Sequence, residues 1–135
     1  MAIPTGGGVE GLRSVMFNAL TDDNMTLITG VRYHIYTVIS IIIHNSKGSA
    51  ASNSPYLGIV GYDVHGSASA QTIHLYHIPV LGTGETFVVN DKFSFYGCEN
   101  DVTQGTTTPQ YLKFTGGNSS DNYDITVTYI DQDWT

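Results

Sequence analysis

Charged residues are scarce in this chain of 135 amino acids. They make up 13% of the sequence, against about 25% in an average soluble domain. Lysine and arginine together number five, and aspartate and glutamate twelve, so the net charge of −7 comes from a shortage of cations. No basic stripe is available to contact phosphates, which argues against nucleic acid as a partner. So few charges indicate extensive contact with other subunits.

Cysteine is nearly absent as well. The single residue, Cys98, excludes an internal disulfide and gives no support for a cysteine metal site. Between a reactive thiol and a structural one, the structural thiol is favoured.

Long apolar runs are also missing, so no segment is expected to span a bilayer. The opening MAIPTGGGVEG lacks the positive region and the apolar stretch of a signal peptide. We therefore expect no membrane partner and synthesis in a cytoplasm. Pro4 and the three glycines 6–8 predict a flexible N-terminal arm over residues 1–11, followed by a single domain over residues 12–135.

The longest run of strand-forming residues is GVRYHIYTVISIIIHN, residues 30–45. Its β-branched residues disfavour a helix, and successive side chains of a strand point to opposite faces. The odd positions are almost wholly apolar, so we expect Ile35, Ile39 and Ile41 to share the core face with Val31. Ile39→Ala is then expected to cost about 2–5 kcal/mol of stability.

Shorter segments of alternating apolar residues complete the pattern, separated by turn signals rich in Gly, Ser, Asn and Asp. Residues 12–20 fit a helix or a strand, and their all-β surroundings favour a strand. The prediction is an all-β fold, an antiparallel β-sandwich or jelly roll of about eight strands. The expected strands cover residues 12–20, 25–29, 30–45, 56–64, 72–81, 85–96, 111–114 and 123–130.

Several local expectations follow from the same alternation. The polar segments 45–55 and 97–109 are predicted loops, and Gly58 and Gly61 are expected to mark a bulge or a close backbone approach. Residues 72–81 are expected to be at least half buried on both faces. Phe87, Val89, Phe93 and Phe95 should share one face, with a bulge or turn at Asn90 and Asp91 that breaks the ribbon. Ile125, Val127 and Tyr129 should point inward.

The residues offer little chemistry. His74 and His77 lie three apart, so on a regular strand they point to opposite faces and cannot share a metal ion without a bulge. Asp131 and Asp133 do not match a calcium loop, and neither a nucleophile elbow nor a phosphate-binding glycine motif is present. We expect no enzyme activity, no metal and no cofactor. The nine tyrosines suit ordinary strands first, and interfaces or sugar binding second.

The two ends of the chain are the candidate contact sites. Residues 1–8 contain too little apolar surface to order by themselves, so Ile3 and Pro4 are expected to dock on a neighbouring subunit. Trp134 is the only tryptophan and is expected to pack at an interface, with Asp131 and Asp133 at its polar rim.

Four segments, MAIPTGGGVEGL, HIYTVISI, ETFVVNDKF and TVTYIDQDWT, resemble in this order small virion structural proteins of tailed bacteriophages, particularly those of marine and cyanobacterial hosts. The resemblance implies a β-sandwich that binds the particle as a homotrimer, decorating or cementing the capsid, with itself and the major capsid protein or other virion proteins as partners. The four segments are structural motifs and transfer no site residues. Two alternatives remain: a tail, neck or fibre component that binds host-surface glycans, and a small glycan-processing enzyme, for which no paired carboxylates can be located.

Overall fold

The structure is a computed structural model that describes residues 9–21, 24–31, 33–62, 70–96 and 110–134. Cys98, Ile3 and Pro4 lie outside the described residues. The described part forms strands and no helix, and thus no helix that could cross a membrane. The nine strands are β1 Val9–Leu20, β2 Asn24–Ile28, β3 His34–Asn45, β4 Tyr56–Tyr62, β5 Ala70–His77, β6 Thr86–Val89, β7 Phe93–Tyr96, β8 Tyr111–Thr115 and β9 Tyr123–Asp133.

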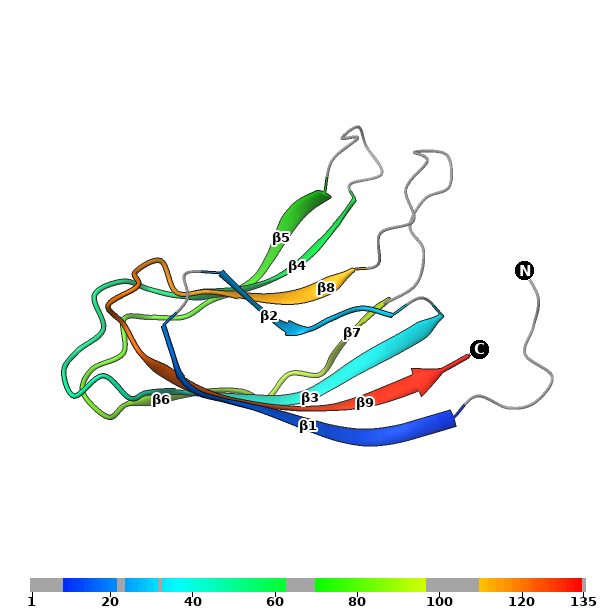
Figure 1. Ribbon diagram of the computed structural model, residues 1–135, viewed down its shortest axis with the longest axis horizontal. Helices are drawn as coiled ribbons and strands as arrows, with labels where there is room; N and C mark the ends of the chain where they lie inside the picture. Colours follow the sequence, from blue (N-terminus) through cyan, green and yellow to red (C-terminus); the bar gives the residue numbers. More distant parts are fainter. Residues whose placement is uncertain (1–8, 22–23, 32, 63–69, 97–109, 135) are drawn as a thin grey trace.

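The strands form two antiparallel sheets that pack face to face, which confirms the predicted β-sandwich (Figure 1). One sheet has the order β1-β9-β3-β6, with β7 also paired to β3, and the other has the order β2-β8-β4-β5. The sheets lie closest at the left of Figure 1 and diverge toward the right, where β9 ends. β1 begins at Val9, so residues 9–11 of the expected arm belong to the sheet.

β3 is the central strand of the larger sheet, but its apolar face is not the one expected from simple alternation. Tyr36 and Val38 are buried in the first half of the strand, whereas Ile41 and Ile43 are buried in the second half. The register with β9 shifts between Val38 and Ser40, so Ile39 is the extra residue of a β-bulge. The bulge exchanges the inward and outward positions, and the prediction of one continuous face is wrong.

The same correction applies to the start of the strand. Val31 and Tyr33, which the alternation placed in the core, precede β3 and are about half exposed. Tyr33 has a φ of 67°, a left-handed conformation that bulky residues rarely adopt and that cannot continue a strand. Ile35 and Ile39 are only partly buried.

The predicted break at Asn90 and Asp91 divides one expected strand into β6 and β7. β6 pairs with residues 41–44 of β3 and β7 with residues 35–38, so the two short strands lie on either side of the bulge. Both predicted sets are buried or packed against the core: Phe87, Val89, Phe93 and Phe95, and Ile125, Val127 and Tyr129.

The Ser-rich loop after β3 is anchored at both of its ends. The side-chain amide of Asn45 donates hydrogen bonds to the carbonyl oxygens of Ser49 at 2.9 Å, Leu81 at 3.2 Å and Gly82 at 2.9 Å. Asn45 is itself buried, and a buried amide needs such partners. The loop therefore has a defined course.

Asp121 anchors the far part of the same loop. Its buried carboxylate accepts hydrogen bonds from the backbone N–H groups of Ser52 at 2.9 Å and Asn53 at 3.2 Å. It also pairs with Lys47, whose Nζ lies 2.9 Å from Oδ1. Burial by itself raises the pKa of the Asp121 carboxyl group, but these donors outweigh it, so the pKa lies below its ordinary value.

The bulge makes a testable distinction between adjacent isoleucines of β3. Ile41 is fully buried and Ile42 is exposed on the opposite face. We expect Ile41→Ala to lower the free energy of unfolding by about 2–5 kcal/mol, and Ile42→Ala and Ile39→Ala to lower it distinctly less. Urea unfolding of the three variants measures the difference. Equal losses for Ile41→Ala and Ile42→Ala would contradict the assigned faces.

The anchor at Asp121 predicts a dependence of stability on pH. Because the folded-state pKa is lowered, the carboxylate contributes stability above its unfolded value of about 3.9, and this contribution is lost as the pH falls through the folded value. Asp121→Asn should cost about 1–3 kcal/mol at pH 7 by leaving buried donors poorly paired. The difference between parent and variant in urea unfolding should shrink below about pH 4. A difference that stays constant under acid would rule out the charge as its source.

Candidate functional site

The end of β9 and the start of β3 carry a cluster of ionisable side chains. His34 Nδ1 lies 2.7 Å from Asp131 Oδ1, and His34 Nε2 lies 3.4 Å from Asp133 Oδ1. Arg13 of β1 also pairs with Asp131, with its Nε 3.3 Å from Asp131 Oδ2. Three strands are therefore tied together at the end where the sheets diverge.

Aromatic side chains pack beside the cluster. Tyr36 stacks on Phe95 with ring centroids 5.1 Å apart, and its hydroxyl oxygen accepts a hydrogen bond from the backbone N–H of Val31 at 3.0 Å. Burial raises the pKa of Tyr36 and of Tyr129, so both phenols are neutral near pH 7. The carboxylates are engaged within the chain, which fits a structural role for the cluster.

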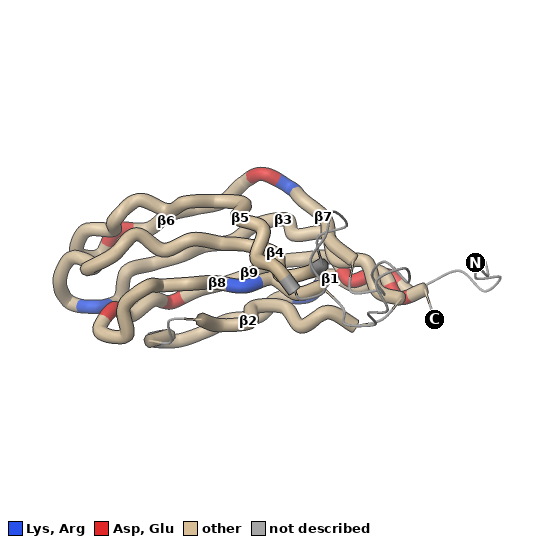
Figure 2. Tube along the Cα trace, turned by 90° about the horizontal axis from the view of Figure 1, so that it is seen from above, with Lys and Arg blue, Asp and Glu red and all other residues tan. Residues whose placement is uncertain are grey.

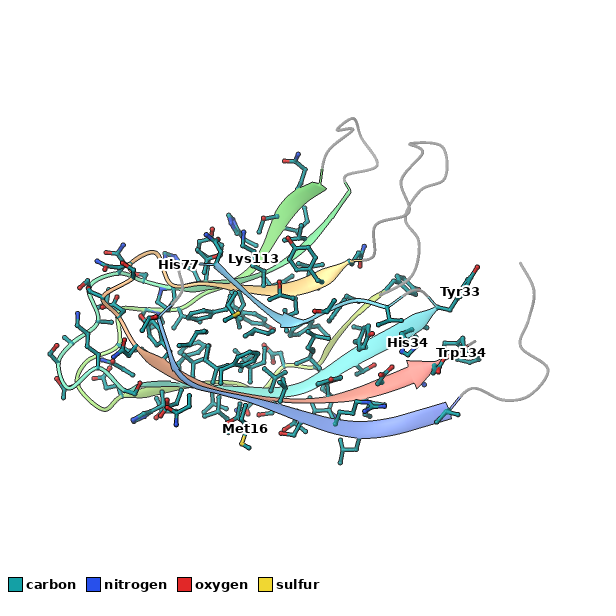
Figure 3. All side chains as sticks on the ribbon, in the orientation of Figure 1. Met16, Tyr33, His34, His77, Lys113 and Trp134 are labelled. Atoms are coloured by element: carbon teal, nitrogen blue, oxygen red, sulfur yellow. The ribbon has the colours of Figure 1, made fainter. Side chains whose placement is uncertain are left out.

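The predicted contact residues are only partly brought together here. Trp134 follows the cluster, is 42% exposed, and its backbone N–H donates to the carbonyl oxygen of Tyr33 at 3.0 Å. Figure 3 shows Tyr33, His34 and Trp134 gathered at this end of the molecule. Asp131 is only 12% exposed in its side chain, so it faces His34 and Arg13. The packing of Trp134 on a partner stays a prediction.

The involvement of His34 and Arg13 could not be found from the sequence. His34 lies 97 positions before Asp131. In the β3–β9 ladder His34 pairs with Asp133. Asp131 is two residues from Asp133 and points to the same face, so its side chain meets that of His34. No local spacing signals such a contact.

A second candidate is the outward side of the larger sheet, which we call the outer face. The register places these residues on it: Glu10, Leu12, Ser14 and Met16 of β1; Asp124, Thr126, Thr128, Ile130 and Gln132 of β9; Ile35, Thr37, Ser40, Ile42 and His44 of β3; Thr86, Val88, Ser94 and Tyr96 of β6 and β7. No lysine or arginine is among them. Glu10 and Asp124, the two charged members, stand near opposite ends of the face.

The middle of the outer face is apolar. Met16, Thr126, Ile42 and Val88 are register partners and form one row across four strands. Met16, Ile42 and Val88 are all exposed, and Figure 3 shows Met16 pointing away from the second sheet. In Figure 2 the charged positions gather mainly in the loops and at the two ends, leaving long stretches of strand without charge. Depletion of charge around exposed apolar side chains is typical of protein interfaces.

A third candidate lies on the smaller sheet. The β4–β5 register shifts between Leu57 and Gly58, with Leu75 as the extra residue of β5. Because Tyr56 pairs with His77 and Gly58 with His74, both histidines point to the same face as Tyr56. The bulge that the spacing of the histidines requires is thus present.

These side chains form a shallow depression of about 250 Å³, lined by Tyr56, His74, Tyr76 and His77. The rings of Tyr56 and His74 meet edge to face, with centroids 4.4 Å apart. In the described part of the chain, no three His, Cys, Asp or Glu side chains are placed to hold a metal ion. The depression offers aromatic faces with polar edges.

The surroundings of this depression correct one prediction and confirm another. Ile73 and Leu75 are exposed, because β5 is the last strand of its sheet, so the expectation that residues 72–81 are half buried on both faces is wrong. A Cβ atom at Gly58 would lie 2.8 Å from the carbonyl oxygen of Ile73. The predicted close backbone approach at Gly58 is therefore confirmed.

Comparisons with solved structures find distant resemblances. A chain from Bacillus endospore appendages, which are disulfide-linked pili, is 12% identical, with 100% of this chain and 96% of that chain covered and a TM-score of 0.42. A chain from the infectious bursal disease virus Gt strain is 13% identical, with 98% and 31% covered and a TM-score of 0.37. A CBM4 structure is 13% identical, with 96% and 86% covered and a TM-score of 0.30. Similarities at this level carry no argument about function.

No model of a known protein family matches the sequence, and no curated protein matches it.

Proposed function

We propose that this protein is a non-enzymatic structural component of a virion, and that it works as a small homo-oligomer bound to the particle through the outer face. The observation that carries the contact surface is the lack of lysine and arginine across that face, combined with the exposed row of Met16, Ile42 and Val88. Interfaces are depleted in charge at their centres, and lysine is costly to bury there.

The virion assignment rests on the resemblance of four sequence segments to small bacteriophage structural proteins. That resemblance favours a capsid decoration or cement protein that binds as a homotrimer, with the major capsid protein or another virion protein as its partner. A β-sandwich whose broad face carries no lysine or arginine suits this role, because binding then needs surface complementarity and no chemistry.

The C-terminal end supplies a second contact in this proposal. Trp134 leaves a large aromatic surface in solvent, and aromatic residues of this kind dominate the energetics of interfaces. The ties of Asp131 to His34 and Arg13 hold the strand that positions it.

Particle loading tests the proposal directly. Each variant is added to particles that lack the native chain. We expect fewer copies of Ile42→Lys and of Trp134→Ala than of the parent protein to bind per particle. Ile42→Lys introduces a charge into the contact, and Trp134→Ala removes an aromatic anchor. Occupancy is counted by electron microscopy, and the melting temperature of each isolated variant reports folding.

The matched control is Ile73→Lys, which places the same charge on an exposed isoleucine of the other sheet. It should load normally. Normal loading of Ile42→Lys as well would remove the outer face from the contact. Light scattering of the free protein reports whether the oligomer is a trimer.

A second candidate function is binding of host-surface glycans, as in a tail or fibre component. The observation that favours it is the depression in which the bulge at Leu75 gathers Tyr56, His74 and His77 on one face. Aromatic rings with hydrogen-bonding edges suit the apolar faces and hydroxyl groups of sugars.

A glycan array separates this candidate from the first. If glycans bind here, Tyr56→Ala should abolish the signal, since it removes the ring that contacts His74. Tyr96→Ala, on the outer face, should leave the signal unchanged. Absence of binding by the parent protein on an array of bacterial surface glycans would eliminate the candidate.

A further inference from the structure

β1 is a long strand with one side open. Its residues pair with β9, and β1 stands last in the order of the larger sheet (Figure 1). Within the described part of the chain, no strand covers its other edge. Alternate residues of this twelve-residue strand therefore direct unpaired backbone N–H and C=O groups to the open side, which is the surface that recruits another strand.

Between Val9 and Phe17 the open edge lacks most of the features by which proteins usually protect one. Natural edge strands are short, or carry lysine, proline or a bulge. β1 contains neither lysine nor proline, and its ladder with β9 is regular from Val9 to Phe17, with a register shift only beyond this stretch, between Phe17 and Leu20. Its one cation, Arg13, is paired with Asp131.

The edge is also the most apolar exposed part of the described structure. Val9, Leu12 and Met16 are 73%, 73% and 77% exposed, and the next large hydrophobic side chain, Tyr96, is 56% exposed. Leu12 and Met16 project from the outer face. An edge of this kind is expected to be covered in the working protein.

We infer that β1 pairs antiparallel with β1 of a second copy of this chain around a two-fold axis perpendicular to the sheet. The argument for a second copy is that β1 is complementary to itself in one register. A two-fold axis in this direction keeps the two outer faces on the same side, so residues that face each other must both point outward or both inward.

The register centred on Ser14 satisfies this condition best. It places Leu12 of one copy opposite Met16 of the other, twice, which buries the exposed apolar side chains against each other. On the inward side it places Gly11 opposite Phe17, where the ring can cover the glycine.

Neighbouring registers are poorer. A ladder centred on Arg13 brings two like charges face to face, which is destabilising. A ladder centred on Val15 places Leu12 opposite Asn18 and Met16 opposite Ser14, so the apolar pairs are lost. The structure thus selects one register in which the two larger sheets join into a single continuous sheet.

This contact does not depend on the virion assignment, and it changes what the oligomer can be. A two-fold contact alone gives dimers, and together with a three-fold association it gives hexamers. Monomers or simple trimers are incompatible with it.

Cysteine cross-linking tests the contact at its centre. In a Cys98→Ser background, Ser14→Cys should form disulfide-linked dimers on mild oxidation, because the two Cα atoms would lie about 4.5–5.5 Å apart. The matched control is Thr128→Cys, which lies beside Ser14 in the same outward row but on β9. It should remain at background on a non-reducing gel.

The register has its own check. Leu12→Cys and Met16→Cys should each give little dimer alone and should cross-link to each other when mixed. The free parent protein should have the mass of a dimer or hexamer by light scattering, and Leu12→Lys should reduce it to a monomer or trimer that keeps the far-ultraviolet circular dichroism spectrum of the parent. Ser14→Cys dimers no more abundant than those of Thr128→Cys, or a parent that is monomeric or trimeric, would overturn the inference.

Discussion

The antiparallel pairing of β3 with β9, interrupted by the bulge at Ile39, is the constraint on which the rest of the structure depends. It joins residues 34–45 to residues 123–133, which lie far apart in the sequence. The extra residue exchanges the faces of β3, so that Tyr36 and Val38 face the core before it, and Ile41 and Ile43 after it. β6 and β7 then pair on either side of the bulge, and both can present their phenylalanines to the core.

The same pairing explains why the charged groups stand where they do. Beyond the core, the inward positions of β9 are Asp131 and Asp133, and those of β1 and β3 are Arg13 and His34. Opposite charges meet there because the register leaves them side by side at the end where the sheets diverge. Between Glu10 and Asp124, which lie near opposite ends of the outer face, the outward positions of the same strands are mainly Thr, Ser, Ile, Leu and Met. A sheet with charges on its inner end and none across the middle of its outer face is suited to contact with other protein surfaces.

Edges and faces have different roles in this arrangement. The outer face offers side chains, most of them uncharged, whereas the open edge of β1 offers backbone groups whose pairing fixes one register. If both are used, the edge sets how copies of the chain join and the face sets what the assembly binds. The smaller sheet differs from both, because a second bulge gathers Tyr56, His74 and His77 into a depression. Two of the four register shifts among the described strands thus set the core face of β3 and form this depression.

By itself, the sequence determined the fold class, the strand positions and much of the core. Alternation and β-branching are local properties, so the inward sets of β6, β7 and β9, the break at Asn90 and the close approach at Gly58 could all be predicted from it. Simple alternation does not reveal a bulge, however, and the faces of β3 before Ile39 and the common face of His74 and His77 therefore emerged only in the structure. The cluster of His34, Arg13 and Asp131 and the open edge of β1 were equally hidden, because strand order and register depend on contacts between residues far apart in the chain.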